Sequence, residues 1–437
     1  MKDEINMKKI QKHPMEAYCI FSALCLGILF VIFFCTNGYL IDKYFMWDWA
    51  DTGMDFFNSI AYTSGGVPYS EYDTLYPPLA NLFFYVLNHF VPKSVVDSWE
   101  KTFENLFVMK MTSRDIRLQQ STMVFFLFFM VITAVLAAYL IEYLLRGRRQ
   151  GAARATAISM IFSFGFTWGI ERGNIILLAF VLCLFFLAFY RHENRMLREA
   201  SYLALAVAAG LKLYPAFLGI LLLVEKDWKA AGRTILYGAC ALILPCFFLK
   251  DGIQSLFMFV EILLSKGNTM DLGQLGLHHT GTGLKDFAGN IIAIYAKLRG
   301  TDESLYTAVL NGFQTAAYVL CAVGLVSALR KGWKNWERVL IICLVMTSIQ
   351  SGAYYTAVYL LIPLILFFRE EDALTRKNVG FVLPMVMIAL QIPLFDLEEL
   401  KLKALWVQGW IVLLWLATLA QIVLRRKGER RVTACPD

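Results

Sequence analysis

The chain has 437 residues, of which 58% are hydrophobic, 15% are aromatic and only 17% are charged. This composition lies outside the range of soluble domains and predicts an integral membrane protein. The net charge of +7 does not indicate nucleic acid binding, because the basic residues occur in short clusters between apolar runs, as in the cytoplasmic loops of membrane proteins.

The apolar runs predict an all-α polytopic fold, with about twelve membrane helices in a single transmembrane domain over residues 1–437. The first run is too long for the core of a signal peptide, so we expect it to be retained as a helix. Basic clusters alternate between the runs in a way that places both termini in the cytoplasm. The predicted runs are 18–41, 121–145, 155–170, 175–190, 202–211, 216–224, 234–249, 305–329, 339–349, 354–368, 379–394 and 405–424.

Two long polar segments, 42–119 and 250–303, are predicted to be extracytoplasmic loops that bear short helices. In the first loop, Pro77 and Pro78 suit the first turn of a helix over 79–90. That helix is rich in Leu, Phe and Tyr, so we expect it to lie along the membrane interface. The chemistry of the protein is expected where this first loop meets the membrane surface.

The runs 202–211 and 216–224 are each too short to cross a hydrocarbon layer of ~30 Å as straight helices. They are expected to form a hairpin that bends at 212–215 and is partly shielded by neighbouring helices. Lys212 is a lone cation at this bend and requires an anion or water nearby. The alternative is that its side chain snorkels to the interface.

The first loop carries three aspartates at the spacing i, i+3, i+7, namely Asp48, Asp51 and Asp55. A helix starting near Asp48 would place all three on one face. For Asp48 and Asp51 we favour a capping role at the positive end of that helix, with catalysis as the secondary interpretation. Asp55 would lie past the first turn among apolar and aromatic residues. A carboxylate there is costly without a partner and suits a general base.

The segment 171–174 lies at the outer end of a helical hairpin. An ionisable pair at this depth is a candidate functional site, although a local ion pair between Glu171 and Arg172 is an alternative. Arg172 and Lys212 would both reach the outer membrane surface. Together they would hold a phosphate or diphosphate, the arginine by its planar fork and the lysine as a point charge.

The second loop contains two adjacent histidines, His278 and His279, within a glycine-rich stretch. Adjacent histidines point in different directions, so a metal site that uses both is not expected. One of them is predicted to hydrogen-bond Asp55 or a phosphate, and an exposed polar turn is the alternative. No metal-binding spacing occurs, and eight of the nine cysteines lie inside apolar runs. No cofactor is therefore predicted, and dependence on a divalent ion is left open.

Four short motifs, taken in order, resemble those of glycosyltransferase family 87. They are Asp55 early in the first loop, Gly66-x-Pro68-Tyr69 followed by Tyr76–Leu79, Arg172-Gly173-Asn174, and Lys212–Pro215. This family comprises membrane transferases that depend on polyprenyl-phosphate mannose and adopt the C-type glycosyltransferase fold. The resemblance covers roughly the first half of the chain. No nucleotide-binding or hydrolase motif competes with it.

The resemblance implies an inverting transfer in which Asp55 takes the proton of the acceptor hydroxyl. It implies that Arg172 and Lys212 hold the donor phosphate, and that His278 or His279 assists. The other candidate residues for donor binding are members of the same motifs, namely Tyr76, Asn174 and Tyr214. The implied partners are a polyprenyl-phosphate sugar, most simply mannose, and a lipid, glycan or protein acceptor. The active site would be extracytoplasmic, on a protein of the cell membrane.

Two other functions are compatible with the same residues. A flippase or transporter of a lipid-linked sugar needs the cations but no base, and it would place carboxylates along a path through the bilayer. In or bordering the apolar runs, apart from the hairpin tip, Glu142 and Glu261 are the acidic candidates, and both lie near ends. A polysaccharide ligase or polymerase would depend on the histidine loop rather than on Asp55.

Overall fold

The computed structural model describes residues 13–46, 51–103, 115–266, 281–301, 306–349, 353–396 and 402–433, with the side chains of 41–42, 266 and 426–433 left out. Apart from one isolated β-bridge, the regular structure of these residues is helical, which confirms the all-α prediction for them. The chain forms two compact units. One contains residues 1–30, 145–165 and 271–437, and the other contains residues 31–144 and 166–270.

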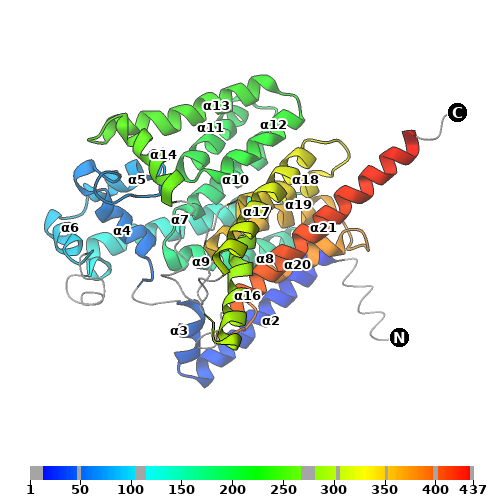
Figure 1. The fold of residues 1–437 in the computed structure, drawn as a ribbon, viewed down its shortest axis with the longest axis horizontal. Helices are drawn as coiled ribbons and strands as arrows, with labels where there is room; N and C mark the ends of the chain where they lie inside the picture. The colour runs from blue at the N-terminus through cyan, green and yellow to red at the C-terminus, as the bar shows by residue number, and fades with distance from the viewer. Residues whose placement is uncertain are drawn as a thin grey trace. The chain divides into compact units, whose positions relative to one another are not determined.

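The unit of residues 31–144 and 166–270 is built around α10, whose residues are all apolar and mostly buried. A helix that is apolar on every side is stable only when other helices surround it. Accordingly α7 and α11 pack on α10, and α13 packs on α11 (Figure 1). The elements are α3 (Tyr39–Phe45), α4 (Met54–Tyr62), η1 (Ser64–Gly66), α5 (Pro78–Asn88), α6 (Lys93–Glu100), η3 (Ile116–Leu118), α7 (Gln120–Leu144), α10 (Ile176–Phe189), α11 (Arg195–Leu211), η4 (Tyr214–Gly219), α12 (Ile220–Val224), α13 (Trp228–Ile243), η5 (Leu244–Phe248) and α14 (Gln254–Lys266).

The other unit has α18 at its centre, and nearly every residue of that helix is buried. The helices α17 and α19 and the 3-10 helix η7 pack against α18, while α20 packs against α21 (Figure 1). The boundary between the units falls within α2 (Pro14–Cys35) and α9 (Phe164–Arg172). The remaining elements of this unit are α8 (Gln150–Ile161), α16 (Leu284–Arg299), α17 (Thr307–Ala328), α18 (Asn335–Ser348), η7 (Tyr354–Leu360), α19 (Leu361–Glu370), α20 (Val379–Ala389) and α21 (Leu402–Thr433).

Within the described residues, five helical segments are long and apolar enough to cross a membrane. A multi-pass membrane protein is therefore supported, and several shorter apolar helices accompany the long ones. The sidedness of the termini stays a prediction. The five segments are Pro14–Cys35, Gln120–Leu144, Trp228–Phe248, Thr307–Ala328 and Leu402–Arg425.

Several predicted runs have different boundaries in the structure. The run 18–41 is not one helix, because α2 ends at Cys35 and α3 begins at Tyr39. The run 155–170 is not one helix, because α8 ends at Ile161 and α9 begins at Phe164. The break lets Gly165 approach the backbone of η7, where a Cβ on Gly165 would lie 2.4 Å from the amide nitrogen of Val358. The run 202–211 is only the end of α11. The first turns of α11 are polar, so the hydropathy of the sequence does not mark them as part of the helix. Asn194 Oδ1 caps them by accepting the backbone N–H groups of residues 196 and 197.

The first polar loop contains a helix close to the predicted range 79–90, and its placement along the membrane interface stays a prediction. It is α5, in which Pro78 is the first residue and Pro77 the N-cap. The proline turn is anchored from two sides, because the Tyr76 carbonyl accepts the Tyr69 hydroxyl at 2.8 Å and the Asn81 amide at 3.2 Å. The Gly-x-Pro-Tyr and Tyr-Pro-Pro-Leu motifs are thus joined in space, which fixes the position of the Tyr76 ring.

Candidate active site

The segment before α4 carries two of the three predicted aspartates. Gly53 caps α4 in the left-handed conformation, with φ of 76°, so the helix cannot extend back through it. Asp51 therefore precedes the helix, and Asp55 lies in its first turn rather than beyond it. The prediction of one helix from Asp48 through Asp55 is wrong at Asp51, as is the capping role of Asp51. Asp48 itself lies outside the described residues.

Arg172, the last residue of α9, nevertheless brings both aspartates together. Its Nη2 donates to Asp55 Oδ1 at 2.8 Å, and its Nη1 donates to the Asp51 carboxylate. The side chains of Arg172 and Asp55 are only 19% and 20% exposed. Burial opposes the charge on Arg172, but the two carboxylates outweigh it and raise the pKa of the guanidinium. Among the described residues, Arg172 pairs with these aspartates and not with the adjacent Glu171.

Asn174 holds the other carboxylate oxygen of Asp55. Its Nδ2 donates to Asp55 Oδ2 at 2.6 Å and to the Tyr76 hydroxyl at 3.1 Å. Its Oδ1 accepts the backbone N–H of Ile176 at 2.9 Å, which fixes which end of the amide faces Asp55. The Asn174 side chain is 1% exposed. Asp55 is therefore oriented by one donor on each oxygen, and lone pairs remain on both oxygens for a further donor.

Lys212 joins the same network through an aromatic ring. It follows the C-terminal end of α11, and its Nζ lies 4.2 Å from the centroid of the Tyr76 ring. Cation, ring, amide and carboxylate form one continuous chain of contacts from Lys212 through Tyr76 and Asn174 to Asp55. Burial lowers the pKa of Lys212 to about 8, and the charge of Asp55 acts in the opposite direction. Tyr214, two residues after Lys212 in the predicted bend 212–215, is the first residue of η4.

Three supporting residues were not predicted from sequence. Asp115 binds Arg117 through contacts of 2.7–3.2 Å, and Arg117 Nη1 donates to the carbonyl of Thr52 at 3.0 Å. Thr52 Oγ1 in turn donates to Glu171 Oε1 at 2.9 Å. These contacts hold the turn that carries Asp51. The available signal was a pair of opposite charges two residues apart, placed just before a long apolar run.

Glu171 is a buried carboxyl beside the network. Its side chain binds Thr52, its carbonyl accepts the N–H of Gly53 at 2.6 Å, and its Oε2 has no hydrogen-bond partner among the described residues. Burial raises the pKa of Glu171 to about 7, while the nearby Arg172 charge and the Thr52 hydrogen bond act against that rise. Ionisation of Glu171 near neutral pH therefore costs folding free energy.

Glu171→Gln is expected to make the protein more stable than wild type at pH 8 but not at pH 4.5. The folded pKa of about 7 lies above the ordinary 4.5, so Glu171 contributes stability at low pH that is lost as the pH rises to 7. The shift corresponds to roughly 3 kcal/mol, and glutamine keeps the acceptor for Thr52. Melting temperatures of both proteins between pH 4.5 and 8 test this, with Glu261→Gln on exposed α14 as the control. Parallel curves for Glu171→Gln and wild type would contradict it.

The predicted histidines, His278 and His279, lie outside the described residues. Their assignment to the site stays a prediction. Over the described ranges, no three His, Cys, Asp or Glu side chains are grouped closely enough to form a metal site. The predicted residues that the structure brings together are Asp51, Asp55, Tyr76, Arg172, Asn174 and Lys212.

Comparison with known proteins gives one match. A family model described as glycosyltransferase family 87 matches residues 74–348. No curated protein and no solved structure matches the chain. The matched range includes Tyr76, Arg172, Asn174 and Lys212, whereas Asp51 and Asp55 precede it.

Proposed function

Because this chain belongs to glycosyltransferase family 87, and is thus a membrane glycosyltransferase, we propose that it transfers a hexose from a polyprenyl-phosphate donor to a hydroxyl acceptor. Mannose is the sugar that the sequence resemblance favours, and the acceptor is a lipid, a glycan or a protein. The C-type glycosyltransferase fold and an extracytoplasmic active site belong to the same proposal. Family membership favours this function over a flippase or transporter.

One observation carries the proposal: Asp55 is held by Arg172 and Asn174 while Lys212 lies one aromatic ring away. A transferase that uses a sugar phosphate needs a base for the acceptor hydroxyl and a cation for the departing phosphate. Both are present in one network, on the same compact unit. Asp55 is still partly exposed, so an acceptor hydroxyl can reach its remaining lone pairs.

The proposed reaction is a single inverting displacement. The acceptor oxygen forms a bond to the anomeric carbon while the bond from that carbon to the phosphate oxygen breaks. The acceptor proton moves to Asp55, and the electron pair of the broken bond leaves with the polyprenyl phosphate. Arg172 and Asn174 keep Asp55 in the orientation that accepts this proton.

Lys212 and Arg172 do not contribute equally to phosphate binding in this proposal. Arg172 already binds two carboxylates, so most of its charge is compensated within the protein. Lys212 contacts the face of the Tyr76 ring, directly beside the residues that hold Asp55. Lys212 is therefore the principal phosphate ligand. Arg172 positions Asp55 and adds to the positive potential that a leaving phosphate meets.

The direct test is a transfer assay with the purified full chain in lipid vesicles. We expect consumption of a polyprenyl-phosphate hexose, with release of polyprenyl phosphate and formation of a glycosylated acceptor. The same hexose on a nucleotide should not be consumed. Movement of the lipid-linked sugar across the bilayer without bond cleavage would instead support the flippase.

Lys212→Gln is expected to raise the KM for the donor by about 10-fold or more, because a charge-assisted hydrogen bond contributes about 1.5–3 kcal/mol. Its pKa of about 8 predicts that the wild-type KM for the donor rises above pH 8 as the lysine loses its charge. Steady-state kinetics over pH 6–9 measure both effects. Lys250→Gln, an exposed cation in the same compact unit, is the control and should leave the KM unchanged. An unaltered KM in Lys212→Gln would remove the lysine from donor binding.

A further inference from the structure

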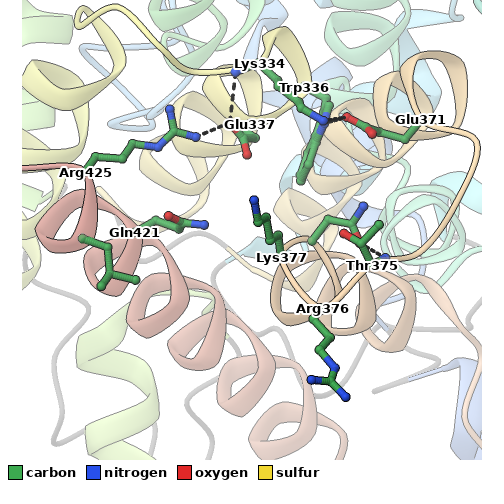
Figure 2. Close-up of a pocket in the computed structure, with 11 residues that line it drawn as sticks. Lys334, Trp336, Glu337, Glu371, Thr375, Arg376, Lys377, Gln421 and Arg425 are labelled. Carbon is green, nitrogen blue, oxygen red and sulfur yellow. Dashed lines mark hydrogen bonds and ion pairs between the residues drawn. The ribbon is translucent and has the colours of Figure 1, made fainter. Parts of the chain in front are cut away.

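A cavity with several charged lining residues lies in the unit that contains α18 and α21, and it includes none of the residues of the Asp55 network. Its volume is about 850 Å³, within the range of ligand pockets. It is bounded by the start of α18, the segment that joins α19 to α20, and the last exposed turns of α21 (Figure 2). Its charged lining residues are Lys334, Glu337, Glu371, Arg376, Lys377 and Arg425.

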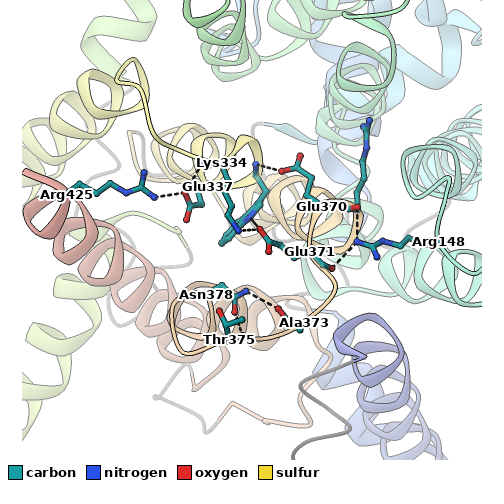
Figure 3. Close-up of polar contacts among 11 residues, drawn as sticks. Arg148, Lys334, Glu337, Glu370, Glu371, Ala373, Thr375, Asn378 and Arg425 are labelled. Carbon is teal, nitrogen blue, oxygen red and sulfur yellow. Dashed lines mark hydrogen bonds and ion pairs between the residues drawn. The ribbon is translucent and has the colours of Figure 1, made fainter. Parts of the chain in front are cut away.

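The walls of the cavity are held by ion pairs. Arg425 Nη2 binds Glu337 Oε2 at 2.8 Å, and Lys334 binds Glu371 on the far side (Figure 3). The indole N–H of buried Trp336 also donates to Glu371, at 3.1 Å. These pairs fix the side chains that face the cavity. They also neutralise two of its four cations.

The segment between α19 and α20 is equally well anchored. The buried side chain of Asn378 accepts the N–H of Thr375 at 2.6 Å and donates to the carbonyl of Ala373 at 3.1 Å (Figure 3). Arg148 donates to the carbonyl of Glu371 at 3.0 Å. The backbone that carries Lys377 is therefore held by hydrogen bonds before any ligand binds, which lowers the entropic cost of binding.

The charges of the cavity do not cancel. The lining includes four cations and two carboxylates, which leaves an excess of two positive charges. The excess resides on Arg376 and Lys377, which form no ion pair with another described residue. Figure 2 shows the Lys377 side chain pointing into the cavity between α18 and α21, and Arg376 pointing away from it at the rim. An anionic group would complete this arrangement.

The position of the cavity along the helices indicates the source of that anion. In the sequence of α21 the apolar residues are followed from Arg425 by a basic stretch, and α18, α19 and α20 all begin or end beside the cavity. This is the level of lipid head groups, on the side predicted to be cytoplasmic. The apolar side chain of Leu424 lines the same cavity and is 62% exposed. We propose that this cavity binds the phosphate group of an anionic lipid, with Lys377 as its central ligand.

This proposal is independent of the glycosyltransferase reaction, because none of these residues belongs to the Asp55 network. A soluble phosphate offers the same chemistry, so the experiment must separate the two sources. The lipid is favoured by the apolar wall and by the membrane level of the cavity. A lipid in this place would brace the ends of four helices.

The test titrates the full chain in a neutral detergent with three probes and counts bound molecules by native mass spectrometry. The probes are short-chain phosphatidylglycerol, phosphatidylcholine with the same chains, and inorganic phosphate. Wild type should bind phosphatidylglycerol at least about fivefold more tightly than phosphatidylcholine. Lys377→Gln should lose about fivefold in that affinity, and Lys377→Gln with Arg376→Gln about 30-fold, since each basic residue near an anionic surface contributes about 1 kcal/mol. Lys377→Arg, which keeps the charge, should bind as wild type does.

The matched control removes the same charge elsewhere. Arg195→Gln with Lys229→Gln changes two exposed cations on the side predicted to be cytoplasmic, and it should bind phosphatidylglycerol as wild type does. Equal binding by Lys377→Gln and wild type overturns the proposal, as does an equal loss in the control. Inorganic phosphate that binds as tightly as phosphatidylglycerol overturns the lipid as the source. Retained binding by Lys377→Arg shows that a loss in Lys377→Gln does not arise from misfolding.

Discussion

Replacing Asp55 by asparagine is expected to lower kcat for sugar transfer by about 10²–10⁴-fold, the range that a positioned general base contributes. Asparagine has nearly the same shape but cannot take the acceptor proton. The donor KM should change much less, because Lys212 and Tyr76 are not altered. A single-turnover assay with saturating donor separates this loss in chemistry from a slow release of product.

Asp51→Asn is the matched control for Asp55→Asn. Both aspartates bind Arg172, but Asn174 contacts only Asp55. Asp51 is 36% exposed, and an exposed ion pair contributes only about 0–1 kcal/mol. Its loss should therefore change kcat by no more than about fivefold. Equal activity in the two variants would show that Asp55 is not the base, provided that both proteins keep the wild-type melting temperature.

Asp55→Glu adds information about geometry. Glutamate keeps the charge but moves the carboxylate by one methylene, away from donors that reach Asp55 at 2.8 and 2.6 Å. A base that must be aligned with both substrate and donors tolerates little displacement, and an error of about 1 Å costs on the order of 10²-fold. We expect partial activity, lower than wild type and higher than Asp55→Asn.

The sequence predicted which residues meet better than it predicted the helices that carry them. Arg172 and Lys212 were expected in one site with Asp55 because the family resemblance implies that they hold the phosphate of the donor. The structure places Arg172 against Asp55 and links Lys212 to it through Tyr76. The helix expected from Asp48 was wrong at Asp51, because one residue, Gly53, adopts a left-handed conformation and α4 begins after it. The spacing of charged residues along the sequence does not reveal such a turn.

The contacts that hold the site in place were not predicted from the sequence. Thr52 binds Glu171, 119 positions along the chain, and Arg117 reaches the carbonyl of Thr52 across 65 positions. Backbone carbonyls accept from any suitable donor, so residue types give no clue to such pairs. The predicted positions of helix ends were wrong for a related reason. The polar first turns of α11 are set by a side-chain cap at Asn194, whereas the apolar run begins at Tyr202, eight residues later.

Gly173→Ala is expected to destabilise the protein by about 2–5 kcal/mol and to abolish most of its activity. Gly173 has φ of +66°, a left-handed conformation that costs an alanine about 1–2 kcal/mol. A Cβ there would also lie 2.8 Å from Phe56 Cβ and 3.0 Å from the Phe126 ring, and such overpacking costs about 1–3 kcal/mol. Phe56 is fully buried, so it cannot move aside without disturbing its neighbours.

The effect on activity follows from the neighbours of Gly173 in sequence. Arg172 and Asn174 flank it and hold the two oxygens of Asp55, so a shift of this turn moves both donors together. Gly252→Ala separates conformational strain from the clash, since Gly252 has φ of +55° in the same unit and no atom within 4 Å of a Cβ built on it. Gly252→Ala should lower the melting temperature only slightly and keep full activity. If Gly173→Ala melts and turns over no differently from Gly252→Ala, the close packing of the Gly173 turn on Phe56 of α4 is not what positions the base.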